Sequence, residues 1–481
     1  MFNWLFGGGV DNPKPLSKIN RKRFSITHQA IPSGTYPGLR NSSGVHCFLN
    51  STIQSLASLT SLESFLGELL NESDKVDTYL PLSEALWDVI QTLNTPSRAV
   101  HTNTAIIDAF SLSDTNNNNT SLMSPSKRAL SLIQSGQQDA QEMFQCISSL
   151  LAHEEGLIKA AKCKVRGLDT LTSSDNTTYT TSFPLAGLTA SRLADLRCGY
   201  VEAIRNIAFD ALSLNLPMQT SCTVEQLLGE YTAIETIEDA SCRRCSLEAT
   251  LARLRQDVKQ LMPADPNKGS TSRRKRIKEA SKQERRLSTL LSEEGDLQED
   301  ARLKDIKVDK SGGGSTKQIL IARPPRILGL HINRSAYLGN GMAVKNPCKI
   351  LFGDTLDITA YTTTGALETA PRKPISSPSK EMIERLTSTG TIPSRVLYTL
   401  KSIVVHYGSH HSGHYVTYRK SRSDDDDEWL RTSDSSVQIV SLADVLQQNP
   451  FMIFYERAVD KKKSENNTPN AQILSTYSLH D

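Results

Sequence analysis

GLRNSSGVHCFLNSTIQSL, residues 38–56, joins a polar loop to an amphipathic helix. The loop runs to His46 and contains Gly44, whereas apolar residues recur at helical spacing after Cys47. These apolar positions are Leu49, Ile53, Leu56 and Leu59. We therefore expect Cys47 to be the first residue of a helix, directly after a loop.

A cysteine in this position can be reactive. A helix N-terminus carries about half a positive charge, which favours the thiolate, the form of cysteine that attacks a carbonyl carbon. The backbone N–H of Cys47 and the side chain of Asn41 could donate hydrogen bonds to the resulting oxyanion, and Gly44 would let the loop approach it closely. Position alone still favours an inert, buried cysteine, so further residues must decide.

Those residues lie near the other end of the chain. In HYGSHHSGHYVTYRK (406–420), His414 stands between a glycine turn and a predicted strand, where a sheet would hold it rigidly beside a cleft. A catalytic histidine needs a third group to orient it, and WLRTSDSSV (429–437) offers Ser433 and Asp434 on a short turn. The combination indicates nucleophilic catalysis by cysteine, although a histidine in a glycine-rich loop is more often structural.

A third motif is GQQDAQEMF, residues 136–144. It precedes an apolar helix face, and Asp139 stands where that helix would begin. The carboxylate of Asp139 could cap the helix by accepting backbone N–H groups, or it could bind a ligand. The residues alone leave both interpretations open.

The order of predicted elements indicates the fold class. The chain has 481 residues, of which 38% are apolar and 22% charged, as in ordinary globular proteins. Helical patterns dominate the first part, interrupted by a low-complexity loop at 111–128. Strand patterns dominate the last part, at 319–334, 349–358, 397–408, 414–420, 437–440 and 451–457. Helices followed by strands favour an α+β arrangement over alternating βαβ units.

Between these parts lies a charged segment, residues 246–316. Its stretch 273–286 carries eight basic and two acidic residues, and 293–309 carries seven acidic and three basic residues. We expect a helical insertion whose charged blocks could pair, ended by the flexible linker SGGGST (311–316). A nuclear signal or nucleic-acid patch is the less favoured interpretation of the basic block.

The composition and the two ends of the chain give expectations about the cellular location of the protein. The net charge of +3 gives no overall attraction to nucleic acid or to an anionic membrane, so we expect no nucleic-acid partner. The eight cysteines are spread thinly, which is typical of a reducing compartment. Residues 1–35 are expected to be a disordered leader without a signal peptide or membrane span, and 458–481 a disordered tail. We therefore predict an intracellular, cytoplasmic protein.

Taken together, these motifs resemble the ubiquitin-specific protease family, the ubiquitin carboxyl-terminal hydrolases of peptidase class C19. GLRNSSGVHCFLNSTIQSL resembles its cysteine box, GQQDAQEMFQCISSLL its glutamine-aspartate box, RPPRILGLHINR its central strand, and HYGSHHSGHYVTYRK with WLRTSDSSVQIVSLADVL its histidine box. The resemblance implies one catalytic domain over 36–457 with a papain-like thumb, palm and fingers. It also implies a thiol-dependent deubiquitinase without a cofactor, which hydrolyses the bond after the C-terminal glycine of ubiquitin in ubiquitinated proteins.

The resemblance also implies residue roles. Cys47 would attack the carbonyl, and His414 would take the thiol proton and later protonate the leaving amine. Ser433 stands where the family usually has Asp or Asn, with Asp434 supporting. This serine resembles the branch associated with the mitochondrial outer membrane, which usually carries an N-terminal membrane span that we do not see here.

Two further sets of residues follow from the same comparison. The oxyanion donor would be Asn41 or Ser42, because the cysteine box has one extra residue before Gly44. Asp139 matches the family acid that holds an arginine of the ubiquitin tail, and the other expected substrate-binding residues are Gln138, Gly413 and His411.

The family often holds zinc in its fingers with two C-x-x-C pairs. Here CRRC supplies Cys242 and Cys245, but the earlier segment reads CGYV. Cys198 is its only cysteine, and Val201 stands where the second cysteine of the pair would be expected. Structural zinc requires four ligands, and we therefore expect no metal, with these three cysteines as the candidate ligands if one binds.

A catalytically silent ubiquitin-binding scaffold of the same fold is the alternative function. Ser433 and the unusual cysteine box leave it open. The joint presence of Cys47, Gly413 and His414 argues for the enzyme, because a scaffold has no chemical need for them.

Overall fold

The structure is a computed structural model of the chain. It describes residues 36–113, 124–136, 138–165, 182–202, 204–262, 270–293, 297, 303–304, 306–337, 339, 341–364, 366–377, 395–409, 412–422 and 428–458. The expected leader, nearly all of the expected tail and His411 lie outside these residues.

The first part of the chain forms a helical unit. Its helices are α1 (Cys47–Leu56), α2 (Thr60–Lys75), α3 (Pro81–Leu93), α4 (Thr104–Ser113), α5 (Pro125–Gln134) and α6 (Ala140–Val165). The predicted loop 111–128 is too long at its C-terminal end. Helix α5 already begins at Pro125, because proline suits a first helical position and the Ser124 hydroxyl caps the helix by accepting the Lys127 N–H.

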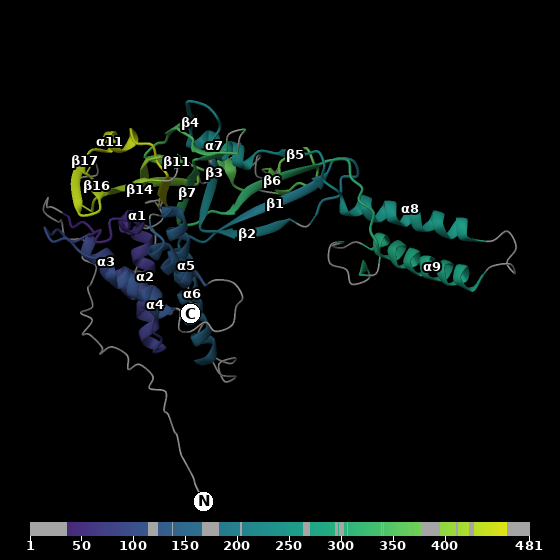
Figure 1. The fold of residues 1–481 in the computed structure, drawn as a ribbon, viewed down its shortest axis with the longest axis horizontal. Helices are drawn as coiled ribbons and strands as arrows, with labels where there is room; N and C mark the ends of the chain where they lie inside the picture. The colour runs from purple at the N-terminus through teal and green to yellow at the C-terminus, as the bar shows by residue number, and fades with distance from the viewer. Residues whose placement is uncertain are drawn as a thin grey trace, which may run out of the picture.

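The C-terminal part forms an eight-stranded sheet with the order β17-β16-β15-β14-β18-β7-β3, in which β11 also pairs with β14. The pairs are antiparallel except for β3 with β7. The strands are β3 (Ala211–Asn215), β7 (Ile327–Asn333), β11 (Thr355–Asp357), β14 (Leu397–Gly408), β15 (Gly413–Lys420), β16 (Trp429–Ser433), β17 (Ser436–Val440) and β18 (Met452–Arg457). Figure 1 shows the helical unit against one face of this sheet.

Helix α1 is the point where the helical unit and the sheet meet. All of its residues are buried. The Thr417 hydroxyl of β15 donates to the Ser51 carbonyl at 2.7 Å, and the Ser402 hydroxyl of β14 donates to the Ser55 carbonyl at 3.0 Å. Polar contacts therefore fix the position of α1 on β14 and β15, and with it the position of Cys47.

A buried arginine strengthens the same junction. The guanidinium of Arg419 on β15 donates to Gln54 Oε1 at 2.9 Å, Asn94 Oδ1 at 2.8 Å and the Leu93 carbonyl at 2.8 Å. Burial lowers the pKa of Arg419 to about 9. Buried cations are tolerated when their donors are satisfied, as they are here, so Arg419 joins α1, α3 and the sheet.

Two segments that were each predicted as one strand form two separate strands in the structure. The run 319–334 breaks at Pro324 and Pro325, because proline has no N–H to give to a sheet. Its first half is β6 (Ser315–Arg323), which joins a second sheet, and its second half is β7. The run 349–358 likewise divides into β10 (Lys349–Leu351) and β11.

The second sheet forms the fingers, with the order β2-β1-β6-β5. Its other strands are β1 (Gly187–Asp195), β2 (Arg205–Phe209) and β5 (Glu235–Ile237). Figure 1 shows it extending away from the helical unit and the main sheet. Between the two sheets lies α7 (Val224–Thr232), which begins with a capping box of Thr223 and Gln226.

Smaller elements complete the architecture. Strand β4 (Ser221–Thr223) pairs in parallel with β10, and the hairpins are β8 (Ser335–Tyr337) with β9 (Ala343–Lys345) and β12 (Ala366–Leu367) with β13 (Ser376–Ser377). The 3-10 helix η3 (Thr359–Tyr361) and helix α11 (Leu442–Leu446) are short.

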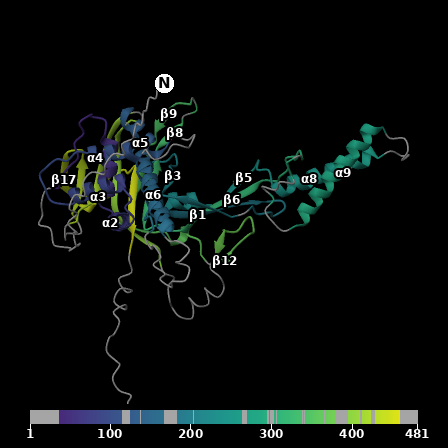
Figure 2. The same cartoon turned by 90° about the horizontal axis from the view of Figure 1, so that it is seen from below.

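The charged segment forms a helical hairpin of α8 (Arg243–Leu261) and α9 (Thr271–Ser292), which projects beyond the fingers in Figures 1 and 2. It has its own apolar cluster, which includes Leu247, Leu251, Leu287 and Leu290. Arg255 of α8 forms an ion pair with Glu284 of α9 at 3.2 Å. The segment is therefore a packed hairpin as well as a charged one, and α8 begins before the predicted boundary at 246.

Helix length and apolarity bear on membrane insertion. None of the helices that the structure describes is both long and apolar enough to cross a bilayer.

Candidate active site

Cys47 is the first residue of α1, and only 2% of it is exposed. Burial raises the pKa of its thiol above the ordinary value, and the negative charge of Asp434 acts in the same direction. The backbone N–H groups of Tyr415 and Phe48 hydrogen-bond to the sulfur and oppose this rise in pKa. The resting group is therefore a thiol, and an attack by its sulfur would require a base to take the proton.

A candidate base lies on β15, the strand that packs against α1. His414 is the second residue of β15, and its neighbour Tyr415 reaches Cys47 through its backbone N–H. The Nε2 atom of His414 lies 2.8 Å from the hydroxyl oxygen of Ser433, the last residue of β16. Since Ser433 engages Nε2, the other ring nitrogen, Nδ1, could accept a proton from a different group.

The turn before His414 has no room for a larger residue. A Cβ atom on Gly413 would lie 2.1 Å from the carbonyl oxygen of Tyr407, and Gly408 has a φ of +125°. The ammonium of Lys345, the last residue of β9, donates to the carbonyls of His406 at 2.7 Å and Gly408 at 2.9 Å. Close backbone packing and Lys345 together hold the end of β14 beside the start of β15, where His414 lies.

Asp434 contacts a different set of groups from its neighbour Ser433. Its carboxylate accepts hydrogen bonds from the side-chain amides of Asn41 at 3.0 Å and Asn50 at 2.8 Å. Its backbone carbonyl accepts from Leu39 N–H at 2.9 Å, and its φ of +50° is unusual for a residue with a side chain. Asp434 thus joins the turn after β16 to the loop before Cys47.

Asn41 is the centre of that loop. Its side-chain oxygen accepts hydrogen bonds from the His46 N–H at 3.1 Å and the Ser43 hydroxyl at 3.4 Å, while its amide nitrogen donates to Asp434. The alternative oxyanion donor, Ser42, is exposed. The geometry therefore fixes the orientation of the Asn41 side chain more fully than the sequence could predict.

Asp139 lies at the start of α6. Its carboxylate accepts the Gln141 N–H at 2.7 Å, as a helix cap does, and burial raises the pKa of this carboxyl. Its charge and that of Cys47 both raise the pKa of the Tyr415 hydroxyl, after the larger effect of burial, which places the three groups in one region. Gln138 precedes Asp139 and donates to the Ser135 carbonyl at 3.4 Å.

The structure thus brings most of the predicted site residues to one junction between α1, the start of α6 and the ends of β15 and β16. They are Cys47, His414, Ser433, Asp434, Asn41, Asp139 and Gly413.

The three candidate zinc ligands lie together at the tip of the fingers. Sγ of Cys198 is 3.5 Å from Sγ of Cys242, and Cys245 belongs to the same cluster. Val201 does not take the fourth place, because it pairs with Ala194 in a β-bridge. The fourth member is Asp195, three residues before Cys198, so the alignment that placed Val201 there is wrong.

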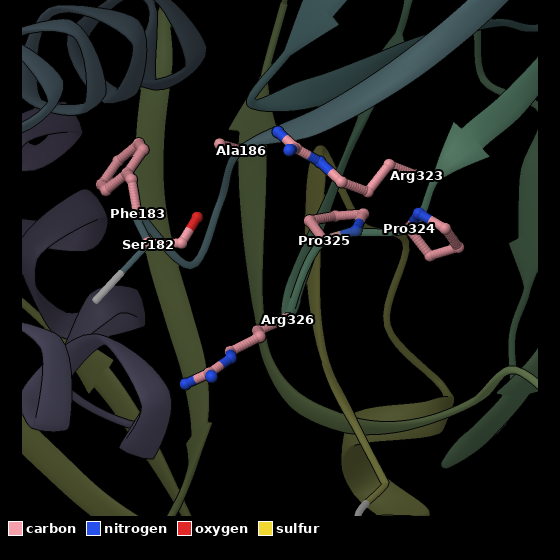
Figure 3. A pocket seen from close by; sticks show the side chains of 7 residues that line it. All are labelled: Ser182, Phe183, Ala186, Arg323, Pro324, Pro325 and Arg326. Carbon is pink, nitrogen blue, oxygen red and sulfur yellow. The ribbon is translucent and has the colours of Figure 1, made fainter. Parts of the chain in front are cut away.

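A shallow pocket lies elsewhere, where the fingers join the main sheet. Figure 3 shows its lining, which comes from the segment before β1 and the turn between β6 and β7. The residues are Ser182, Phe183, Ala186, Arg323, Pro324, Pro325 and Arg326. None of the catalytic candidates lines it, and we assign it no role.

The sequence prediction missed three contributors to the site: Asn50, Tyr415 and Lys345. Asn50 follows Cys47 by one helical turn, a spacing that places both on one side of α1 and was a usable signal. Tyr415 contributes a backbone N–H, and Lys345 comes from a distant hairpin. Neither contribution has a signature in the local sequence.

Comparison with known proteins identifies the family of the chain. The family model described as ubiquitin carboxyl-terminal hydrolase matches residues 37–455. Ubiquitin carboxyl-terminal hydrolase 30 of Mus musculus is 23% identical, with 90% of this chain and 86% of the relative covered. Ubiquitin carboxyl-terminal hydrolase 27 of Arabidopsis thaliana is 25% identical, with 88% and 85% covered.

Solved structures show the same fold. A yeast SAGA DUB module with a mutant Sgf73 aligns with a TM-score of 0.52 and 17% identity over 88% of this chain and 68% of that one. A SAGA DUB module bound to ubiquitin aldehyde gives a TM-score of 0.50 and 17% identity over 88% and 70%. The predicted α+β papain-like fold is confirmed. The chain belongs to the ubiquitin carboxyl-terminal hydrolase family and is a cysteine-type deubiquitinating protease.

Proposed function

We propose that Cys47, His414 and Ser433 form the catalytic triad with which this protease cuts after the C-terminal glycine of ubiquitin. One observation carries the assignment. His414 is 2.8 Å from the Ser433 hydroxyl, while the backbone N–H of the next residue, Tyr415, reaches the Cys47 sulfur. A nucleophile, a base and a group that orients the base are the components that acyl transfer requires.

The chemistry follows from the protonation state of the thiol. Because burial raises the pKa of Cys47, the proton moves to Nδ1 of His414 as the sulfur attacks the carbonyl carbon. The tetrahedral intermediate collapses to a thioester, and the leaving amine takes the proton from His414. Water, deprotonated by His414, then hydrolyses the thioester, which releases the ubiquitin carboxylate and restores the thiol.

Ser433 makes this triad weaker than one with a carboxylate. A neutral hydroxyl can hold the imidazole in one orientation, but it stabilises the positive charge on His414 less than an aspartate would. The serine therefore supports a slower proton transfer with the same geometry.

We assign Asp434 a positioning role at the oxyanion. Its carboxylate holds the Asn41 amide at 3.0 Å, and Asn41 orders the loop that ends at Cys47. We propose that this amide and the N–H of Cys47 donate to the negative oxygen of the intermediate.

Ubiquitin and ubiquitinated proteins are the proposed partners. The support is the family membership, together with the similar fold of the SAGA DUB module that was solved with ubiquitin aldehyde. Asp139 is the proposed acceptor for an arginine of the ubiquitin tail, and Gln138, Gly413 and His411 are proposed to line the path of that tail. An intracellular, cytoplasmic location fits these partners, and no disulfide joins the cysteines that the structure describes.

Variants of Ser433 test the triad. The hydrogen bond to His414 contributes about 0.5–1.5 kcal/mol, so Ser433→Ala should lower kcat by about two- to tenfold with little change in KM. Ser433→Asp should restore or exceed the wild-type kcat. The measurement is steady-state hydrolysis of a fluorogenic ubiquitin C-terminal amide. Equal kcat values for wild type and Ser433→Ala would remove Ser433 from the triad.

A further inference from the structure

The outer side of helix α9 carries basic residues and no acidic ones. A rotation of about 100° per residue places five basic positions within an arc of about 100° around the helix axis. All five are exposed, and we call them the basic face: Arg274, Lys275, Lys278, Lys282 and Arg285. The other residues of α9 within this arc are serine or threonine, so the arc contains no apolar residue either.

The opposite side of α9 holds the helix in the hairpin. Leu287 and Leu290 are buried in the apolar cluster that α9 shares with α8, and Ala280 and Leu291 pack against that cluster. Figures 1 and 2 show the hairpin projecting beyond the fingers. The basic face therefore points away from α8 and into solvent.

Other cations of the hairpin have acidic partners, which the basic face lacks. Arg255 pairs with Glu284 at 3.2 Å, and Arg253 pairs with Asp309 at 2.7 Å. None of the five side chains of the basic face forms an ion pair with a residue that the structure describes. The paired arginines thus stabilise the hairpin, whereas the basic face is left to interact with something else.

The spacing within the basic face opposes helix stability. Arg274, Lys278 and Lys282 follow one another at one-turn intervals, and like charges at this spacing repel one another. Glu279 lies just outside the arc and accepts a hydrogen bond from Gln283 at 3.3 Å. A bound polyanion would replace this repulsion by attraction.

The composition of the basic face indicates phosphate groups as its partner. The centre of a protein interface is usually apolar or aromatic, and a helix that inserts into a membrane surface exposes an apolar side. The basic face has neither feature. Lysine and arginine without apolar neighbours suit the regularly spaced phosphates of a nucleic acid, for which this electrostatic attraction supplies most of the non-specific binding.

The shape of the basic face favours duplex DNA among nucleic acids. The face extends about 16 Å along a helix about 10–12 Å wide, and the major groove of B-DNA, about 12 Å wide, admits one helix. Arg274, Lys278 and Arg285 form one row along α9. Lys275 and Lys282 form a second row, so the two rows match the two phosphate strands that border the groove. Binding of a single strand would instead call for aromatic residues on which bases stack.

We propose that the basic face of α9 binds duplex DNA through its phosphates, without preference for sequence. The net charge of +3, from which no nucleic-acid partner was expected, averages this face with acidic residues elsewhere in the chain. Figure 1 shows α1, which carries Cys47, at the other end of the molecule from α9. Bound DNA would therefore leave the catalytic candidates accessible and hold the protease near ubiquitinated proteins on the same DNA.

Binding of the full chain to a fluorescent DNA duplex of random sequence, followed by anisotropy, tests the proposal. Each phosphate contact adds about −0.9 to the slope of log K against log salt, so five contacts predict a slope of about −4.5. Affinity should then fall about 500-fold between about 50 and 200 mM salt. The triple variant Lys275→Gln, Lys278→Gln, Lys282→Gln should have a slope of about −2 and bind at least about a hundredfold more weakly at about 50 mM salt.

A matched control removes the same charge from other elements. The triple variant Arg323→Gln, Arg326→Gln, Arg372→Gln replaces three exposed cations outside the hairpin and should bind the duplex as wild type does. Circular dichroism checks that both triple variants keep the helix content of wild type.

Several results would overturn the proposal. Wild type that does not bind the duplex at about 50 mM salt would remove it. Equal weakening in the control variant would assign binding to overall charge. Equal affinity for single-stranded DNA would show that the groove is not used. Tighter binding to vesicles of phosphatidylcholine and phosphatidylserine in equal amounts, lost in the α9 variant, would assign the face to an anionic membrane.

Discussion

At the scale of single residues, the neighbours Ser433 and Asp434 contact opposite parts of the site. Ser433 holds the imidazole of His414, whereas Asp434 holds Asn41 and Asn50 on the side of the nucleophile. Adjacent residues on a turn can do this because the φ of +50° at Asp434 turns the chain between them. The proposed base and the proposed oxyanion donor are therefore held by different side chains.

This division predicts opposite effects of Asp434→Asn on two rates. Burial is the main cause of the raised pKa of Cys47, but the negative charge of Asp434 contributes. Without that charge the thiolate forms more readily, so alkylation by iodoacetamide at pH 7 should be equal to or faster than in wild type. Hydrolysis of ubiquitin amide should fall at least about tenfold, because the oxyanion donor loses its orientation.

The two assays on Asp434→Asn separate the proposed roles. Parallel losses of alkylation and hydrolysis would show that Asp434 supports the thiol itself, and unchanged hydrolysis would show that it does not position the oxyanion donor.

Asp139 predicts a pH dependence of ubiquitin binding. Burial raises the pKa of its carboxyl, and an arginine of the ubiquitin tail would favour the charged form and lower that pKa. Binding then releases a proton, so affinity should weaken as the pH falls toward the raised pKa of the free enzyme. Isothermal titration of ubiquitin into Cys47→Ala protein between pH 7.5 and 5 measures this without turnover.

Two further variants on the Cys47→Ala background serve as controls. Asp139→Asn should bind about tenfold to a hundredfold more weakly and lose the pH dependence, because a charged hydrogen bond is worth about 1.5–3 kcal/mol. Glu142→Gln changes a nearby carboxylate that pairs with Arg128, and it should keep the pH dependence. If the pH dependence of binding remains in Asp139→Asn, a different titratable group causes it.

The sequence could identify candidate site residues better than it could predict the contacts between them. Cys47, His414 and Ser433 stand in recognisable motifs, so the sequence alone could identify them as candidates. The contact of Asp434 with Asn41, and the place of Asp195 beside three cysteines, arise from segments far apart in sequence. Such contacts depend on how the sheets and helices pack, which local patterns do not encode.

At the scale of elements, the site depends on how β15 begins. The strand starts at Gly413, pressed against the backbone of β14, and carries His414 one residue later. That β14 and β15 are strands could be predicted, because aromatic and β-branched residues are frequent in both segments. The break at Pro324 and Pro325 was also readable, since proline cannot donate within a sheet, although the strand pattern of 319–334 continues on both sides of it.

Gly413→Ala tests this dependence on close packing. Its Cβ would lie 2.1 Å from the Tyr407 carbonyl oxygen, so the backbone must shift and carry His414 with it. Misplacement by about 1 Å can cost about a hundredfold in rate, and kcat/KM for ubiquitin amide should fall by this order.

Gly156→Ala in α6 is the matched control, because a Cβ there meets nothing within 4 Å. It should leave kcat/KM unchanged and stabilise the fold by about 1 kcal/mol, since alanine favours a helix more than glycine does. Thermal unfolding and kinetics of both variants provide the comparison. Wild-type activity in Gly413→Ala would show that the turn tolerates movement.

At the scale of the whole molecule, the order of motifs predicted the fold. Helices followed by strands indicated an α+β protein, and the family match over 37–455 agrees. The hairpin of α8 and α9 shows the limit of that reasoning. Its charge suggested a solvated segment, but spaced leucines such as Leu247, Leu251 and Leu287 give it a small core of its own. These leucines are diluted by charged residues, which concealed the apolar face.

The proposed mechanism requires the sulfur of Cys47 to attack ubiquitin. A ubiquitin with a C-terminal electrophile, reacted with the full chain and analysed by peptide mass spectrometry, tests this directly. We expect one adduct on Cys47 in the wild-type protein, slower formation of the same adduct in Ser433→Ala, and none in Cys47→Ala. An adduct on another cysteine, or equal labelling of the Cys47→Ala protein, would contradict it.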